Sequence, residues 1–262
     1  LLTNKAKLSP SLSPIIAGCL ILSAPLIMAF QNFDDHSRMH HYASRDYASN
    51  FLNSVEENAI IFTYGDNDTY PLWYAQEVEN IRRDVRVVNL SLIAVDWYIE
   101  KLRRKVNDSP PLKLTIPSEG YRGNKRNQIT VYNPANPQVT DSPIDLVREL
   151  AYIANPQNEV TDDEGSKHTL IRSTNLYIPI DKAKMIQNGV VSAQEADKIV
   201  PNINIKLPAG TRYITKDDLA VMDLLASNIH DRPVYFAVTC KNEKLLGIND
   251  YTQMEGLGLR VI

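Results

Sequence analysis

An abrupt change of composition constrains this chain more than any other feature. Residues 8–33 carry no charged side chain, and directly after them come Asp34, Asp35, His36 and Arg38. An uncharged run of this length can cross the hydrocarbon core of a bilayer, about 30 Å thick, as one helix. The ionisable cluster begins where such a helix would leave the lipid. The sequence therefore predicts one transmembrane helix, with the remaining chain starting at the membrane surface.

The charges that flank the uncharged run differ in sign on its two sides. Lys5 and Lys7 precede it, whereas Asp34 and Asp35 follow it. Because positively charged flanks stay in the cytoplasm, we expect a transmembrane segment with a cytoplasmic flank at 1–33 and an extracytoplasmic domain at 34–262.

Three other interpretations of the apolar run stay open. A cleaved signal peptide has the same polarity, although no small-x-small cleavage site precedes the polar region. A lipoprotein signal ending at Cys19 would leave most of the apolar run after the cysteine instead of before it. A buried helix of a globular domain would need apolar neighbours on every side.

The overall composition excludes some classes of protein. The net charge is −3, so the chain lacks the broad basic face of a nucleic-acid-binding protein, and we expect no nucleic-acid partner. Cys19 and Cys240 are the two cysteines, too few for a disulfide framework. The first residue is not Met, and Ile262 falls within a strand-like pattern, so we expect the chain to be a fragment of a longer protein.

Hydrophobic patterns after residue 58 predict an α/β domain. The apolar run at 59–64 is typical of a buried strand, and a second strand, rich in β-branched residues, is expected at 85–90. Helical patterns follow these two strands at 72–83 and 96–106. The order strand, loop, helix, strand implies a parallel unit with a right-handed crossover. A further buried strand is expected at 233–239. We therefore predict a Rossmann-like, parallel or mostly parallel sheet with flanking helices, preceded by one transmembrane helix.

Other segments give weaker patterns. Helices are expected at 36–55 and 216–228, the second with Thr215 as its N-cap and Asp218 completing a capping box. Residues 107–136 are rich in proline and polar residues, so we expect an irregular excursion with one short strand at 128–132. Further elements are expected at 144–154 (helix), 155–167 (loop), 170–180 (strands) and 192–199 (short helix).

The segment after the first predicted strand is the main candidate for a functional loop. It contains Asp66, Asn67, Asp68 and Thr69, with Trp73 in the helix that follows. Ligands of open α/β sheets collect at the carboxyl ends of parallel strands, which is where this segment lies. Asp66 and Asp68 could hold a divalent cation. We favour a loop whose side chains bond their own backbone and cap a helix, so we predict no metal and no cofactor.

The membrane-proximal residues form a second candidate site. His36 and His40 are four residues apart and could chelate a metal from one helix face. The simpler interpretation is the start of an interfacial helix, where acidic residues suit the N-terminal dipole. Phosphate contact near the bilayer is a further hypothesis. This cluster comprises Asp34, Asp35, His36, Arg38 and Arg45.

Two aromatic pairs lie in the helices around the second predicted strand. They are Trp73 with Tyr74, and Trp97 with Tyr98. Aromatic residues in such positions usually pack in a core, and the alternative is a platform on which sugar rings stack.

Several of these segments together resemble a known family. Asn32–His36 after an apolar run, Arg45–Ala48, the long stretch Asn58–Glu79, Arg83–Leu92 and Asp231–Thr239 form one pattern. This pattern resembles the polytopic membrane proteins of Bacteroidetes grouped as domain of unknown function 2723. That family is similar to protein O-mannosyltransferases of the type C glycosyltransferase class.

The resemblance implies a function for the larger protein. Type C enzymes transfer a sugar from a polyprenyl-phosphate carrier to a protein or glycan acceptor, so the implied partners are the lipid bilayer, that donor and such an acceptor. Their catalytic acid normally lies in an early extracytoplasmic loop, which would precede Leu1, so no catalytic residue is assigned here. The implied location is the inner (cytoplasmic) membrane with a periplasmic domain.

We therefore expect the soluble region of a membrane glycosyltransferase, non-catalytic by itself. Two alternatives stay open. One is a membrane-anchored binding or assembly module. The other is a metal-dependent hydrolase using Asp66 and Asp68.

Overall fold

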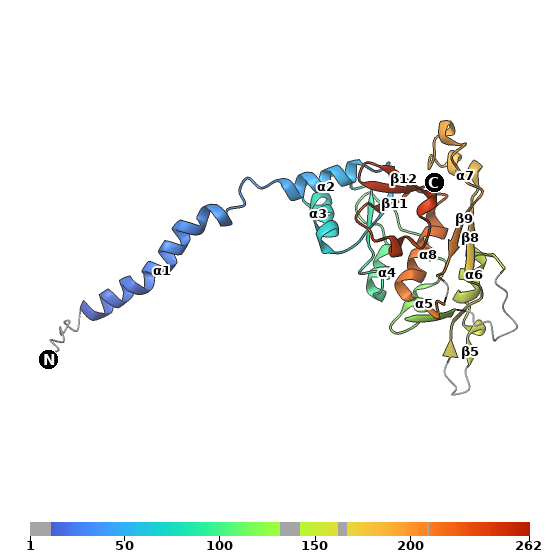
Figure 1. The fold of residues 1–262 in the computed structure, drawn as a ribbon, viewed down its shortest axis with the longest axis horizontal. Helices are drawn as coiled ribbons and strands as arrows, with labels where there is room; N and C mark the ends of the chain where they lie inside the picture. The colour runs from blue at the N-terminus through green and yellow to red at the C-terminus, as the bar shows by residue number, and fades with distance from the viewer. Residues whose placement is uncertain (1–11, 132–141, 162–166, 209) are drawn as a thin grey trace. The chain divides into compact units, whose positions relative to one another are not determined.

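The chain divides into two units in a computed structural model that describes residues 12–131, 142–161, 167–208 and 210–262 (Figure 1). The units comprise residues 1–43 and 44–262, and each is described by itself.

The first unit consists of one long helix, α1 (Leu12–His36), with none of its residues buried. Among the described residues, α1 is the one helix long and apolar enough to cross a membrane. Pro25 lies inside the helix. Proline is tolerated in membrane helices because the freed backbone groups are satisfied locally. Lys5 and Lys7, on which the predicted orientation rests, lie outside the described residues.

The predicted helix 36–55 is wrong at its start. Helix α1 continues to His36, the chain then leaves the helix, and α2 begins at Ala43 and ends at Asn53. The Arg38 side chain donates from Nη1 to the Asp35 carbonyl at 2.8 Å, which satisfies an oxygen in the last turn of α1. Asp34 and Asp35 therefore lie at the end of a helix and not at the start of one. No proline or glycine lies between Phe30 and His36 to stop the helix earlier.

The second unit contains a five-stranded sheet in the order β12-β13-β11-β1-β2. Strand β1 (Ile60–Thr63) is parallel to both β2 (Arg86–Asn89) and β11 (Val234–Ala237), as predicted. Strands β12 (Thr252–Glu255) and β13 (Gly258–Val261) are antiparallel to each other, and β13 is antiparallel to β11. The sheet is therefore mixed, whereas the sequence predicted a parallel or mostly parallel one.

The hairpin β12–β13 explains this difference. Gly256 and Leu257 alone connect the two strands, and a connection this short can only join antiparallel neighbours. Gly256 has φ +57°, and a Cβ at this position would lie 2.4 Å from Ser54 Oγ. Only glycine combines an unstrained positive φ with the absence of a Cβ that would clash with Ser54.

The three parallel strands form the centre of the core. Every residue of β1, β2 and β11 is buried, and the Phe62 and Phe236 rings stack with their centroids 4.8 Å apart. Burying one large apolar side chain contributes about 1.5–3 kcal/mol. The helices next to this sheet in the sequence are α3 (Asp66–Glu77), α4 (Asp96–Leu102) and α8 (Lys216–Asn228).

Helix α8 is buried nearly all round, at ten of its 13 residues. Thr215 is its N-cap residue, as predicted, but no side chain caps the backbone, and Thr215 Oγ1 instead donates to Asp218 Oδ2 at 2.9 Å. Further along α8, Asp223 and Asn228 accept hydrogen bonds from backbone N–H groups of residues 113–116. The described part of the proline-rich excursion is therefore tied to the core through α8.

The remaining elements are short and form small sheets. Strand β3 (Gln128–Val131) matches the strand predicted at 128–132, of which Tyr132 lies outside the described residues, as does the rest of the excursion to Asn136. The sheets are β10-β3-β7, β4-β8-β9 and β5-β6. Their strands and the other helical segments are α5 (Ser118–Tyr121), β4 (Ile144–Asp145), α6 (Leu146–Ala154), η1 (Pro156–Asn158), β5 (Val160–Thr161), β6 (Lys167–His168), β7 (Leu170–Ile171), β8 (Asn175–Pro179), α7 (Lys182–Gln187), η2 (Ala193–Glu195), β9 (Asn202–Lys206), β10 (Tyr213–Thr215), η3 (Asn242–Leu245) and η4 (Asn249–Tyr251).

Candidate functional site

The predicted functional loop after β1 is the first turn of helix α3. Gly65 precedes the helix with φ +84°, a conformation that glycine adopts without strain and that turns the chain directly from β1 into α3. The loop assignment and the expected start of this helix at residue 72 are therefore wrong, because α3 begins at Asp66. Pro71 lies inside α3, where it removes the N–H that would bond the Asn67 carbonyl and its ring crowds that carbonyl. Thr69 supports the turn by donating from Oγ1 to the Gly65 carbonyl at 2.7 Å.

Asp68 is a buried carboxylate that connects three elements. The Tyr47 hydroxyl of α2 donates to Oδ1 at 3.0 Å, and Thr239 Oγ1, just after β11, donates to Oδ2. Burial and the neighbouring Asp68 carboxylate raise the pKa of Tyr47 to about 12. Both oxygens of Asp68 therefore have hydroxyl partners within the fold.

Asp66 lies on a different face of α3. Residues two apart on a helix do not face each other, and Asp66 is exposed while Asp68 is buried. The charge of Asp66 raises the pKa of the Tyr70 hydroxyl. Among the described residues, no three His, Cys, Asp or Glu side chains are grouped to hold a metal ion. The geometry therefore gives no support to a hydrolase that uses Asp66 and Asp68 together.

We expect the two aspartates to differ in their effect on stability. Asp66→Asn should change the free energy of unfolding by less than about 1 kcal/mol, the scale of a charge near a helix N-terminus. Asp68→Asn should cost about 2–3 kcal/mol, because a donating amide replaces an oxygen that accepts a buried hydrogen bond. Urea denaturation of both variants measures the difference.

The same proteins test the metal hypothesis. We expect calcium and magnesium to leave the melting temperature of the wild-type chain and of Asp66→Asn unchanged. A rise in the wild type alone would contradict this expectation, because ligands that bind only the folded state stabilise it.

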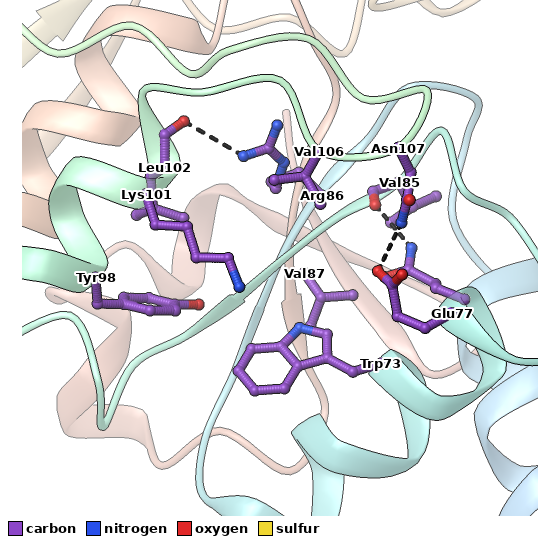
Figure 2. A pocket seen from close by; sticks show the side chains of 11 residues that line it. Trp73, Glu77, Val85, Arg86, Val87, Tyr98, Lys101, Leu102, Val106 and Asn107 are labelled. Atoms are coloured by element: carbon purple, nitrogen blue, oxygen red, sulfur yellow. Dashed lines mark hydrogen bonds between the residues drawn. The ribbon is translucent and has the colours of Figure 1, made fainter.

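A pocket of about 320 Å³ lies beside the β2 strand, between α3 and α4 (Figure 2). Trp73 extends from α3 toward the pocket, and Lys101 reaches in from α4. The Lys101 Nζ atom lies 5.9 Å from the centre of the Trp73 ring, within reach of a cation–π interaction. The residues that line the pocket are Trp73, Gln76, Glu77, Val85, Arg86, Val87, Tyr98, Lys101, Leu102, Val106 and Asn107.

Polar side chains form one wall of this pocket. Asn107 Nδ2 donates to Glu77 Oε1 at 2.7 Å, and Arg83 Nη2 donates to Asn107 Oδ1 at 2.8 Å. Asn107 is thus held between an acidic and a basic side chain. The pocket has an aromatic face and a polar wall, the combination of groups found in sites for polar ligands.

Arg86, in β2, lines the pocket and bonds the loop that follows α4. Its guanidinium donates to the carbonyls of Leu102, Arg104, Ser109 and Pro110. Burial lowers the pKa of Arg86 to about 10. The loop after α4 is therefore fastened to β2 by one buried cation.

The membrane-proximal residues are divided between the two units. Asp34, Asp35, His36 and Arg38 belong to residues 1–43, whereas Arg45 belongs to residues 44–262. The nearest carboxylate oxygen to Arg45 Nε is Glu79 Oε1 at 3.5 Å, and this partly exposed ion pair contributes little stability.

His36 and His40 do not share a helix face. His36 ends α1, and His40 lies in a turn beyond it. Phosphate contact by Arg38 or Arg45 stays a prediction.

The aromatic pairs have separate roles. Trp73 and Tyr98 line the pocket, with Tyr98 buried, whereas Tyr74 and Trp97 are mostly exposed. The sequence singled out Trp73 but missed Lys101, Glu77 and Asn107. The spacing of Trp73 to Glu77, and of Tyr98 to Lys101, places each pair on one helix face and was an available signal.

The comparisons with known proteins support a relation to protein O-mannosyltransferases, and they do not support the Bacteroidetes group in particular. Residues 44–262 match the family model described as TMEM260-associated domain 2. The chain belongs to this family. It is also similar to "Protein O-mannosyl-transferase TMEM260" of Mus musculus, with 31% identity over 86 residues. That match covers 32% of this chain and 12% of the mouse protein, so the chain corresponds to a small part of its relative. No solved structure matches the chain.

Proposed function

We propose that this TMEM260-associated domain, with helix α1 as its anchor, belongs to a membrane glycosyltransferase. In that protein a sugar passes from a polyprenyl-phosphate carrier to a protein or glycan acceptor. The family match, the O-mannosyl-transferase name of the mouse relative and the apolar α1 support the proposal. Membership of the Bacteroidetes group, and a periplasmic position of the domain at the inner membrane, are part of the same proposal.

The pocket beside β2 carries the more specific proposal that the domain serves the acceptor side. Trp73 offers an aromatic face, and Lys101 and Asn107 offer donors. Glu77 is the one carboxylate among the described residues that line the pocket, and it already accepts a hydrogen bond from Asn107. This arrangement suits binding better than proton transfer, which needs an acid or base free to reach the reacting atom.

The proposal predicts separate effects on binding and chemistry. Residues 34–262 alone should transfer no sugar. In the full-length protein, Trp73→Ala should raise the KM for the acceptor about tenfold with kcat little changed, the pattern expected when only uniform binding is lost. Tyr74→Ala, on the neighbouring exposed residue, is the matched control and should leave both constants unchanged. Asp35→Ala should weaken activity without abolishing it.

Transfer assays with a polyprenyl-phosphate sugar distinguish the outcomes. Sugar transfer by residues 34–262 would refute the non-catalytic role. A loss of kcat in Trp73→Ala with KM unchanged would refute the acceptor role of the pocket.

The predicted orientation has its own test. A reporter that is active only after export, fused behind Ile262, should be active in cells, because basic flanks stay in the cytoplasm. Exchanging Lys5 and Lys7 for Glu, with Asp34 and Asp35 changed to Lys, should reduce that activity. An active cytoplasmic reporter at the same position of the unchanged chain would overturn the orientation.

The alternative is a membrane-anchored binding or assembly module without catalysis in the larger protein. The same pocket would serve such a module. The sequence upstream discriminates between the two, because many further spans with an acidic first loop favour the transferase.

A further inference from the structure

Among the residues that the structure describes, β2 is the outermost strand on one side of the central sheet, and β1 is its one sheet neighbour. The Arg86 N–H donates to the Ala59 carbonyl and the Leu90 N–H to the Thr63 carbonyl, both at 2.8 Å. In a parallel pair, alternate residues bond the same neighbour. Residues 85, 87 and 89 therefore direct their main-chain groups away from β1.

Two of these three residues have an outward main-chain group that bonds a side chain of α3 or α4. The Val85 carbonyl accepts from Gln76 Nε2 at 2.8 Å, and the Asn89 N–H donates to the Tyr98 hydroxyl at 2.8 Å. Among the described residues, neither the N–H nor the carbonyl of Val87 has a hydrogen-bond partner. Unpaired N–H and carbonyl groups of an edge strand are a template for pairing with another extended chain.

The unpaired groups belong to a residue that lines the pocket. Val87 lies next to Trp73 in Figure 2, with Lys101 reaching toward the same space. A partner that fills the pocket would therefore meet a donor and an acceptor from Val87 and an aromatic face from Trp73.

A second hollow continues the pocket on the side of α4. It has a volume of about 520 Å³ and shares Lys101 and Val106 with the first. It is lined by Trp97, Glu100, Lys101, Arg104, Lys105 and Val106. Glu100 contacts Arg103 and Arg104, and Ser118 donates to it, whereas Lys101 and Lys105 have no ion pair within the described residues. The surface next to Val87 therefore has excess positive charge.

We propose that the free edge of β2 binds an extended, acidic polypeptide segment by strand addition. One residue of this segment pairs antiparallel with Val87 and exchanges two hydrogen bonds with it. An adjacent side chain packs on Trp73, and flanking carboxylates meet Lys101 and Lys105. The inference rests on the proposed function and names the form in which an acceptor polypeptide reaches the domain.

The pattern of groups favours a polypeptide over other occupants. A phosphate offers only acceptors and leaves the Val87 carbonyl without a donor, whereas a peptide residue supplies both. A second copy of the chain would bring its own Lys101, Arg104 and Lys105 against the same cations, and like charges at an interface are unfavourable. The caps at Val85 and Asn89 restrict main-chain pairing to one residue, so binding should be weak.

The test uses the 262-residue chain in zwitterionic nanodiscs. The probe is acetyl-Asp-Val-Thr-Val-Asp-amide, and its matched control carries an N-methyl group on the central Thr. Binding is followed by tryptophan fluorescence and by hydrogen exchange of the Val87 amide. We expect the probe to slow exchange at Val87 and to bind at least tenfold more tightly than the N-methylated peptide. Lys101→Glu should weaken binding about tenfold, and Lys182→Glu, far along the sequence on α7, should not.

Each other outcome overturns the proposal. Equal binding of the two peptides would exclude main-chain pairing, and absence of binding or of Val87 protection would exclude the site. Protection that grows with protein concentration without peptide would assign the edge to a second copy. Protection in anionic nanodiscs alone would assign it to lipid. None of these readouts involves sugar transfer, so a failure here leaves the transfer assays of the proposed function to be judged separately.

Discussion

Asp223→Ala is expected to lower the free energy of unfolding by about 3–5 kcal/mol, because it leaves several buried hydrogen-bond donors without an acceptor. Asp223 is fully buried in α8. Its oxygens accept from the Thr115 N–H at 2.7 Å, the Ile116 N–H at 3.0 Å and the Tyr121 hydroxyl at 3.0 Å. Ser227 Oγ also donates to it, at 3.1 Å. Alanine removes every one of these acceptors and leaves a cavity.

Urea denaturation of the chain measures the effect, with Asp218→Ala as the matched control. Asp218 lies on the same helix but is only partly buried, with Thr215 Oγ1 and Lys244 as its partners. We expect less than about 1 kcal/mol from the control, the scale of a lost interaction at a helix start. Similar losses in the two variants would show that Asp223 does not hold the segment 112–121 to α8.

Strands β1 and β11 could be predicted because each contains a continuous apolar run, whereas β2 was indicated by its β-branched residues between Arg86 and Asn89. Runs such as Ile60–Phe62 and Val234–Ala237 are typical of buried strands, and a strand–helix–strand order such as β1–α3–β2 favours parallel pairing. The hairpin β12–β13 gave no such signal. Residues 252–255 are partly exposed, and their pairing depends on the turn at Gly256.

Helix boundaries were predicted less accurately, for local reasons. Helix α3 ends at Glu77, earlier than the helical pattern suggests, and Asn80 and Arg82 then adopt positive φ. The Gln76 side chain bonds the carbonyls of Arg82 and Val85, which stabilises this tight turn. Such contacts depend on tertiary structure and leave no periodic pattern.

The candidate site was found only where one residue type was informative by itself. Trp73 stood out as an aromatic residue next to a strand end. Lys101 and Asn107 are ordinary polar residues, and they meet Trp73 only because α3, α4 and the loop after α4 pack around β2. Asp68 was assigned to a loop because its partners, Tyr47 and Thr239, are distant in the sequence.

Arg86→Met is expected to lower the free energy of unfolding by about 2–4 kcal/mol, because the carbonyls of Leu102, Arg104, Ser109 and Pro110 lose a charged donor. Methionine keeps most of the volume of the aliphatic stem, so the loss reports on the hydrogen bonds more than on packing. The pocket wall after α4 should become mobile as a result. Hydrogen exchange of residues 103–110 checks this local effect.

Two features of the structure set the size of that loss. Arg232 also donates to the Pro110 carbonyl and to Ser109 Oγ, so part of the loop keeps a partner in the variant. Burial and the nearby Arg86 charge lower the pKa of Arg232 to about 10, so removing Arg86 relieves a repulsion and offsets some of the cost.

Arg104→Met is the matched control, because the Arg104 side chain is 73% exposed and its ion pair with Glu100 spans 4.0 Å. We expect less than about 0.5 kcal/mol there. Equal losses from Arg86→Met and Arg104→Met in urea denaturation would show that Arg86 does not fasten the loop to β2.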